Sequence, residues 1–153
     1  IGEGCHFIDL MRHLVGNNII SFQATMIGNV PGVEIREDKV SITLSFKDGS
    51  FGTIHYLANG GSAFPKERIE VFCDDAVLPM DNYRVLSGYG WSGFKKMRLF
   101  KQDKGQEACA KVFIDSISNG EESPIPYDEI MESSRVSIEV ANLLAVKFND
   151  KKG

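Results

Sequence analysis

The sequence predicts an α+β fold: an open, mostly antiparallel β-sheet with helices packed on one face. Apolar residues recur at helical spacing near the start of the chain, alternate with polar residues through its middle, and return to helical spacing near its end. Strands and helices segregated in this way are typical of α+β proteins. The length of 153 residues suits one core, so we expect a single domain over residues 1–153.

The first expected helix spans residues 7–15. Its apolar positions follow the helical period, and Gly16 supplies a C-cap after the last of them. These apolar residues are Phe7, Ile8, Leu10, Met11, Leu14 and Val15.

Seven segments have strand character, set by β-branched and apolar residues between turn signals. They are residues 18–27, 39–47, 51–58, 68–73, 76–80, 83–86 and 96–101. Asp48-Gly49 predicts a tight hairpin between the second and third, because both residues tolerate a positive φ. Asp74-Asp75 predicts another turn between the fourth and fifth.

Two helices are expected at the end of the chain, over residues 106–118 and 128–148. Acidic Asp128 and Glu129 open the second, where the helix dipole favours them. The first places these apolar residues on one face: Ala108, Cys109, Val112, Phe113 and Ile117. The second carries Ile130, Met131, Ile138, Ala141 and Ala145.

Composition excludes several classes of partner and compartment. With 17 Lys and Arg against 21 Asp and Glu, the net charge is -4, so we expect no nucleic acid partner. No apolar run approaches the roughly 20 residues needed to span a bilayer, and no signal peptide pattern occurs, so we expect no membrane partner. The three cysteines are far apart and form no C-x-x-C pair, which favours a reducing cytoplasm.

Two short patterns contain residues typical of binding or catalytic sites, but we expect structural roles for both. GYGWSG at residues 88–93 has the spacing of a dinucleotide-binding loop, but the next residues alternate like a strand, which favours a flexible loop of the kind that edges sites. Cys5 and His6 hold metal-ligand atoms, yet adjacent helical side chains point about 100° apart, so we expect no metal site. Cys5 is read as a small buried residue in preference to a nucleophile.

His6 is the strongest candidate for chemistry. On a helix, His6, Asp9 and His13 fall within roughly 60° of one another, along the margin of the apolar stripe. An imidazole there can exchange a proton with a bound hydroxyl or carbonyl group. Spacing alone favours the alternative, a helix-capping or boundary histidine that is satisfied by Asp9 or Glu3.

The stretch GEGCHFIDLMRHLVG, residues 2–16, resembles the start of the C-terminal domain in the glucose-fructose oxidoreductase and inositol dehydrogenase (Gfo/Idh/MocA) family. Gly4, His6 and Asp9 match the family's Gly-x-His-x-x-Asp pattern. FPKERIEVFCDD at residues 64–75, MDNYRVL and KGQEACAKVFIDSISNGEESPIPYDEI resemble a branch of that family that acts on sugars.

The resemblance implies NAD(P)-dependent oxidation or reduction of a sugar or nucleotide-sugar. It assigns His6 as the catalytic proton donor and acceptor and Asp9 as its support. Glu3 stands beside Gly2, where many members carry Asp, and is the candidate substitute. The family binds NAD or NADP mainly through an N-terminal Rossmann domain that this chain lacks, so we expect no cofactor in this fragment and no activity from it alone.

The remaining expectations concern substrate and partners. Lys66, Arg84 and Tyr56 are candidate substrate contacts, because cations on loops and a phenol at a strand end can bind hydroxyl groups or phosphate. The chain begins with Ile and enters a helical pattern at once, as a piece of a longer polypeptide would. We expect a homo-oligomer that packs against its own Rossmann domain; the alternative is a non-catalytic binding or dimerisation module.

Overall fold

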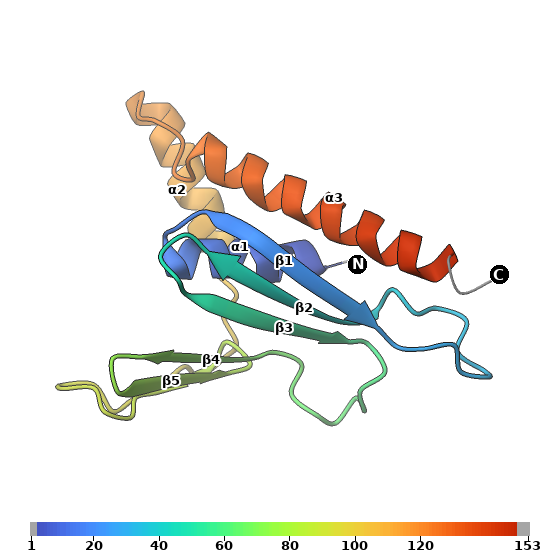
Figure 1. Cartoon of the computed structure of the whole chain (residues 1–153). Coiled ribbons are helices and arrows are strands. Elements are labelled where there is room, and N and C mark those ends of the chain that lie inside the picture. The colour runs from blue at the N-terminus through green and yellow to red at the C-terminus, as the bar shows by residue number, and fades with distance from the viewer. Residues whose placement is uncertain (1–2, 150–153) are drawn as a thin grey trace. The chain divides into compact units, whose positions relative to one another are not determined.

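The computed structural model describes residues 3–149. Over those residues the chain forms three α-helices and seven β-strands, which confirms the predicted α+β fold (Figure 1). In chain order they are α1 (Gly4–Val15), β1 (Ile19–Met26), β2 (Lys39–Phe46), β3 (Phe51–Leu57), β4 (Arg68–Cys73), β5 (Ala76–Asp81), β6 (Val85–Ser87), β7 (Lys96–Arg98), α2 (Gln106–Asn119) and α3 (Tyr127–Asn149). Each lies within a few residues of its predicted place.

The chain divides into two compact units. Unit 1 comprises Ile1–Asn59 and Ile125–Gly153, and unit 2 comprises Gly60–Pro124. Unit 1 contains α1, α3 and the antiparallel sheet β1-β2-β3; unit 2 contains α2 and the antiparallel sheet β4-β5-β6-β7. The strands therefore form two sheets, with the Gly-rich segment 59–61 after β3 separating them. That residues 1–153 act as one substrate-binding domain stays a prediction.

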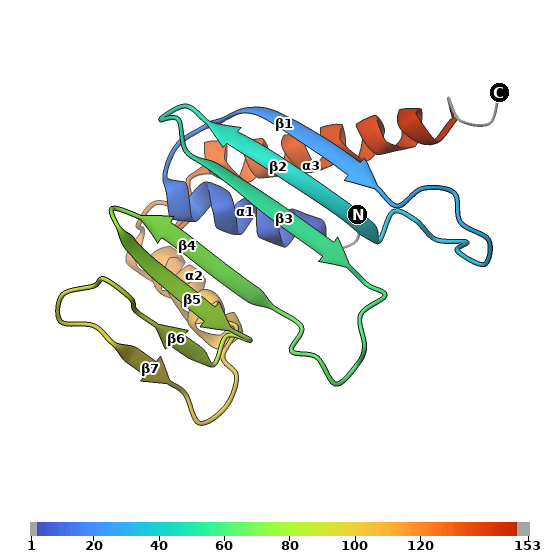
Figure 2. The same cartoon turned by 60° about the horizontal axis from the view of Figure 1, so that its bottom comes forward.

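In unit 1, α1 and α3 cover one face of the sheet (Figure 2). Every second side chain of β2 is buried beneath them, as strict alternation in its sequence predicts. The β2–β3 register pairs Ile42 with Ile54, both inside the core. The intervening turn has Gly49 at φ +90°, and Asp48 Oδ1 accepts a hydrogen bond from Ser50 N at 3.0 Å. Turn residues and alternation together thus determine which face of the sheet is buried.

Helix α1 packs against β3. A Cβ atom added to Gly52 would lie 2.8 Å from Met11 Sδ, so a larger residue there would require the flexible Met11 side chain to move. The helix ends at Gly16, which has φ +69° and donates its N–H to Arg12 O, as the sequence predicts. The position of α1, and of any side chain that it carries, is therefore set by the sheet.

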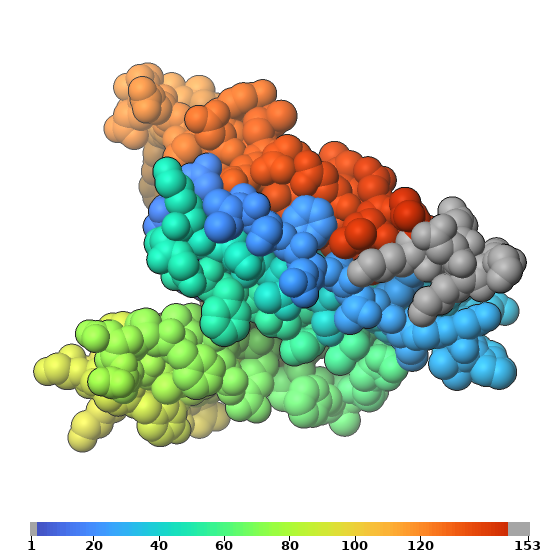
Figure 3. Space-filling view, viewed as in Figure 1, coloured from blue at the N-terminus to red at the C-terminus, as the bar shows by residue number. Residues whose placement is uncertain are grey.

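The buried side of α3 differs from the apolar residues singled out in the sequence. The helix turns Val136, Val140 and Leu144 into the core. The predicted set lies on the opposite side and is exposed; its members are Ile130, Met131, Ile138, Ala141 and Ala145. The orange-to-red atoms of α3 form an outer ridge of unit 1 in the space-filling view (Figure 3). Because both sides of the helix carry apolar residues, its period alone does not say which side faces the sheet.

Helix α2 has the predicted bounds, but its apolar face is open. Of its fourteen residues, all described, Ser116 alone is buried. Val112, Phe113 and Ile117 are between 51% and 64% exposed, and Ala108 and Cys109 are exposed as well. The expectation that this face packs on a sheet is wrong for this chain.

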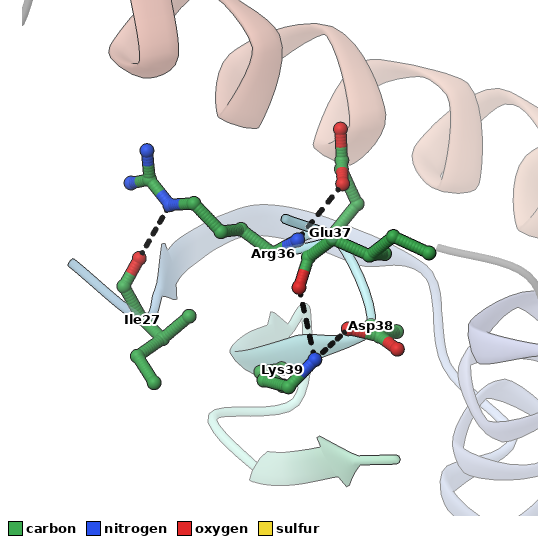
Figure 4. A network of polar contacts seen from close by, with 6 residues as sticks. Ile27, Arg36, Glu37, Asp38 and Lys39 are labelled. Atoms are coloured by element: carbon green, nitrogen blue, oxygen red, sulfur yellow. Dashed lines mark hydrogen bonds and ion pairs between the residues drawn. The ribbon is translucent and has the colours of Figure 1, made fainter. Parts of the chain in front are cut away.

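A polar network closes the long connection between β1 and β2 (Figure 4). Arg36 is buried and donates from Nε to Ile27 O at 3.0 Å, while its own N–H reaches Glu37 Oε2 at 3.1 Å. Hydrogen bonds from the backbone N–H groups of Glu37 and Arg36 lower the pKa of the Glu37 carboxyl. Lys39 Nζ contacts Asp38 Oδ1 at 2.6 Å. The connection is therefore ordered by its own polar groups.

Candidate functional site

His6 lies in the first turn of α1, with its backbone N–H bonded to Glu3 O at 3.1 Å. Gly4, Ile8 and Arg12 form the buried stripe of this helix, and His6 points to the opposite side at about 100° per residue. The side chain is exposed, so it lies away from the core and not at the margin of the apolar stripe as expected.

The partners considered for a boundary histidine do not hold His6. Within residues 3–149, its imidazole has no hydrogen bond or ion pair with Glu3 or Asp9. Glu3 occupies the N-cap position of α1 but makes no side-chain capping bond. His13 follows two turns later on the same side and is also exposed. The ring nitrogens of His6 are therefore accessible to a ligand.

Arg12 fixes the helix that carries His6, and sequence analysis did not single it out. Its Nε atom lies 2.6 Å from Glu132 Oε2, and both side chains are at least nine-tenths buried. The other oxygen of Glu132 accepts the N–H of Ile19 at 3.0 Å, and Glu129 Oε1 lies 3.8 Å from Arg12 Nη1. One ionic cluster thus joins α1, α3 and β1. Its sequence signal is a cation four residues after Ile8, inside the apolar stripe.

The three candidate substrate contacts are divided between the units. Tyr56 lies on β3 in unit 1, paired with Val40 and packed half-buried against the core. Lys66 and Arg84 are exposed residues of unit 2, and Arg84 Nε donates to Leu99 O at 3.3 Å. That Lys66 and Arg84 share a site with His6 stays a prediction.

Within unit 2, Lys66 and Arg84 flank a polar cluster that sequence analysis missed. Asn82 N donates to Glu67 O at 2.7 Å, which joins the segments that carry these two cations. Lys104 Nζ lies 2.5 Å from Glu67 Oε1 and 5.9 Å from the ring centre of Tyr83.

Tyr83 in this cluster has a strained backbone and an altered acidity. Its φ of +50° is rare for an aromatic residue, and such strain concentrates where a fold or site requires it. Burial, followed by the negative charge of Glu67, raises the pKa of the Tyr83 hydroxyl, while Lys104 opposes the shift. The phenol therefore remains protonated to a higher pH than an exposed tyrosine.

The remaining patterns give no separate site. Among residues 3–149, no three His, Cys, Asp or Glu side chains are grouped to hold a metal ion. The GYGWSG loop leads into strand β7 and not into a helix, so it lacks the helix N-terminus on which a dinucleotide phosphate would sit. None of the described helices is both long and apolar enough to cross a membrane.

The fold is shared with solved oxidoreductase structures. UDP-N-acetylglucosamine 3-dehydrogenase from Acidithiobacillus ferrooxidans matches 92% of this chain and 44% of its own, with a TM-score of 0.68 and 14% identity. Aldose-aldose oxidoreductase from Caulobacter crescentus matches 91% of this chain and 43% of its own, with a TM-score of 0.66 and 17% identity. The chain therefore spans less than half the length of either structure.

The family comparison is more specific than the shared fold. A search of the curated proteins finds no match. A family model described as the GFO/IDH/MocA C-terminal domain matches residues 2–78, about half of the chain, and this stretch includes Gly4, His6 and Asp9. The chain belongs to the GFO/IDH/MocA C-terminal domain family.

Proposed function

We propose that this chain is the substrate-binding domain of an NAD(P)-dependent oxidoreductase that acts on a sugar or nucleotide-sugar. The observation that carries the proposal is His6, whose imidazole is exposed and has no partner among residues 3–149, on a helix held by a buried ion pair. A proton-transfer group needs an anchored backbone and an accessible ring, and the held helix and exposed side chain of His6 support this role. Solvent exposure is consistent with a site that is completed by a further domain, because closing a site excludes water.

In the proposed reaction, His6 handles the proton. As a hydroxyl-bearing carbon is oxidised to a carbonyl, the imidazole accepts the hydroxyl proton, and it returns the proton in the reverse direction. A bound nicotinamide cofactor supplies hydride transfer in such chemistry, and the described residues offer no cradle for its phosphates. We assign cofactor binding to an N-terminal Rossmann domain. Asp9, half-buried one turn from His6, and Glu3 at the N-cap are the supporting carboxylates.

The substrate class and compartment rest on separate observations. The two solved structures described above are named for a nucleotide-sugar and an aldose, which supports a sugar or nucleotide-sugar substrate. We also propose a cytoplasmic location, because Cys5, Cys73 and Cys109 are far apart in the sequence and form no C-x-x-C pair.

An activity assay tests the proposed function. The full-length protein that contains this chain is incubated with aldoses and nucleotide-sugars and with NAD or NADP, and reduced cofactor is followed by absorbance. We expect turnover by the full-length protein and none by residues 1–153 alone, since we assign binding of the hydride-accepting cofactor to the Rossmann domain. Turnover by residues 1–153 alone, or none by the full-length protein with any of these substrates, would contradict the proposal.

Self-association is a second expected property, and it is also what a non-catalytic dimerisation module would show. The face of the unit 1 sheet opposite the helices carries Phe51 and Leu57, which are 76% and 57% exposed. Covering such residues removes apolar area from water and favours association. We expect sedimentation velocity to show a concentration-dependent dimer or larger species that Phe51→Ser/Leu57→Ser weakens. A strictly monomeric species at high concentration would contradict this prediction.

A further inference from the structure

Strand β7 forms a free edge of the unit 2 sheet. It is the last strand in the order β4-β5-β6-β7, and among residues 3–149 no strand pairs with its other side (Figure 2). All three of its residues, Lys96, Met97 and Arg98, are exposed. An exposed edge strand offers backbone N–H and C=O groups to which a further strand can bond.

The hydrogen bonds of the β6–β7 hairpin determine which residues of β7 face its free edge. Gly88 N donates to Lys95 O at 2.8 Å, which makes these two residues a bonded pair. Because only alternate residues of an antiparallel strand bond to a given neighbour, Met97 also bonds to β6. Lys96 and Arg98 therefore direct their backbone N–H and C=O groups away from β6. In the described part of the chain these outward groups have no partner.

The same two residues carry the charge of this edge. Side chains alternate along a strand, so Lys96 and Arg98 lie on one face of the sheet and Met97 lies on the other. Neither cation has an ion pair or a side-chain hydrogen bond with any of residues 3–149. Asp81 pairs with Val85, which pairs with Arg98, so this carboxylate shares a cross-strand row with Arg98 but lies two strands away, roughly 10 Å.

The segment around β7 has the same sign of charge. Residues 82–102 contain five Lys or Arg and no Asp or Glu, in a chain whose net charge is -4. Opposite charges on paired strands attract one another, and like charges repel. Pairing with β7 of a second copy would place cations against cations, so the charge of this edge favours an acidic strand as its partner.

We infer that β7 binds an extended acidic segment of a partner protein, which adds to the unit 2 sheet as a further strand. The backbone of this segment bonds to the outward N–H and C=O groups of Lys96 and Arg98, and its carboxylates lie opposite the two cations. About four backbone hydrogen bonds and two charge pairs make a small interface, so we expect a dissociation constant on the order of 0.1 mM. This binding goes beyond the proposed sugar oxidation and does not depend on it.

A designed peptide tests the inference. The full-length protein that contains this chain is titrated into a fluorescein-labelled peptide in which three glutamates alternate with valines, so that the glutamates share one face of a strand. Fluorescence anisotropy measures binding, and hydrogen exchange locates it. We expect saturable binding and slower exchange of the Lys96 and Arg98 amide hydrogens with solvent deuterium. Absence of saturation, or unchanged exchange at both residues, would overturn the inference.

Two matched peptides separate strand pairing from charge. N-methylation of the glutamate amides keeps the charge but removes the donors that face β7, so we expect at least about fivefold weaker binding. Glutamine in place of glutamate keeps the donors but removes the charge, and we expect binding to weaken about 3- to 10-fold. If the N-methylated peptide, or a thymidine oligonucleotide of equal charge, binds as tightly as the acidic peptide, then β7 attracts any polyanion and strand addition is wrong.

Variants of the protein test the same contributions. Lys96→Gln/Arg98→Gln is expected to weaken binding of the acidic peptide about 3- to 10-fold and to leave binding of the glutamine peptide unchanged. Lys96→Pro also removes an outward N–H, without loss of a bond to β6, and is expected to bind more weakly than Lys96→Gln.

The matched control is Lys47→Gln/Lys111→Gln, which removes two exposed charges outside β7 and should weaken binding less than about twofold. An equal loss of affinity in this control would show general charge attraction and overturn the site. Self-association of Lys96→Gln/Arg98→Gln with no loss of peptide affinity would also overturn it, because the two cations would then serve only to keep edge strands of different copies apart.

Discussion

His6→Asn in the full-length protein is expected to lower kcat by about 10²- to 10⁴-fold, the usual contribution of general acid–base catalysis. Asparagine keeps some hydrogen-bonding capacity but has no nitrogen that titrates near neutrality. Substrate affinity is expected to change little, because the lost function belongs to the transition state. Steady-state kinetics with the best substrate of the activity assay measure both quantities.

His13→Asn is the matched control for this experiment. His13 lies on the same exposed side of α1, two turns further on, and it has no counterpart in the family pattern Gly-x-His-x-x-Asp. We expect its kcat to stay near that of the unsubstituted protein. Both side chains are exposed, so neither change should shift the free energy of unfolding by more than about 0.5 kcal/mol. Equal kcat values for the two variants, per folded molecule, would show that His6 is only a surface histidine.

Arg12→Met is expected to lower the free energy of unfolding of unit 1 by about 3–5 kcal/mol. The substitution leaves the Glu132 carboxylate, only 10% exposed, without the guanidinium that lies 2.6 Å away. An unpaired buried charge is costly even though the complete pair need not be strongly stabilising. Chemical denaturation followed by circular dichroism measures the loss.

Two further variants distinguish charge burial from packing. Arg12→Met/Glu132→Gln removes both charges and keeps an acceptor for Ile19 N–H, so it should recover part of the loss. Arg135→Met breaks an exposed pair with Glu139 and should cost less than about 1 kcal/mol. An Arg12→Met protein that is no less stable than Arg135→Met would contradict the expected role of the buried cluster.

The β2–β3 hairpin could be predicted closely because local chemistry determines it. Alternation places Val40, Ile42 and Leu44 on one face, and Asp48-Gly49 suits the turn. Helix ends at Gly16 and Gly120 follow for the same reason, since both adopt the left-handed conformation that glycine favours.

Features that depend on contacts between residues far apart in the sequence could not be predicted in this way. Helix α3 has apolar residues on both sides, and the sheet alone determines that Val140 is buried while Ile138 is 62% exposed. In the sequence, Arg12 is a polar residue within the apolar stripe of α1. Its partner Glu132 lies 120 residues away in the sequence, so the pattern around Arg12 does not predict the pair. The separation into two sheets depends on strand pairing, which short-range patterns do not encode.

The candidate site shows the same limit. Helical periodicity places His6, Asp9 and His13 on one side of α1, but periodicity cannot tell a reacting imidazole from a surface one. The family pattern separates His6 from His13, and the structure adds that the His6 ring has no partner among the described residues. The cluster of Glu67, Tyr83 and Lys104 was missed because a φ of +50° at a tyrosine leaves no signal in sequence.

The solvent exposure of α2 has a consequence for local unfolding of the chain. A fourteen-residue helix in water is only marginally stable by itself, and burial of Ser116 alone adds little. We expect its amide hydrogens to exchange with solvent deuterium well before those of α1 and α3, whose inner faces are packed in the core. Residues 106–119 would then unfold and refold locally, while α1 stays folded and still exposes His6.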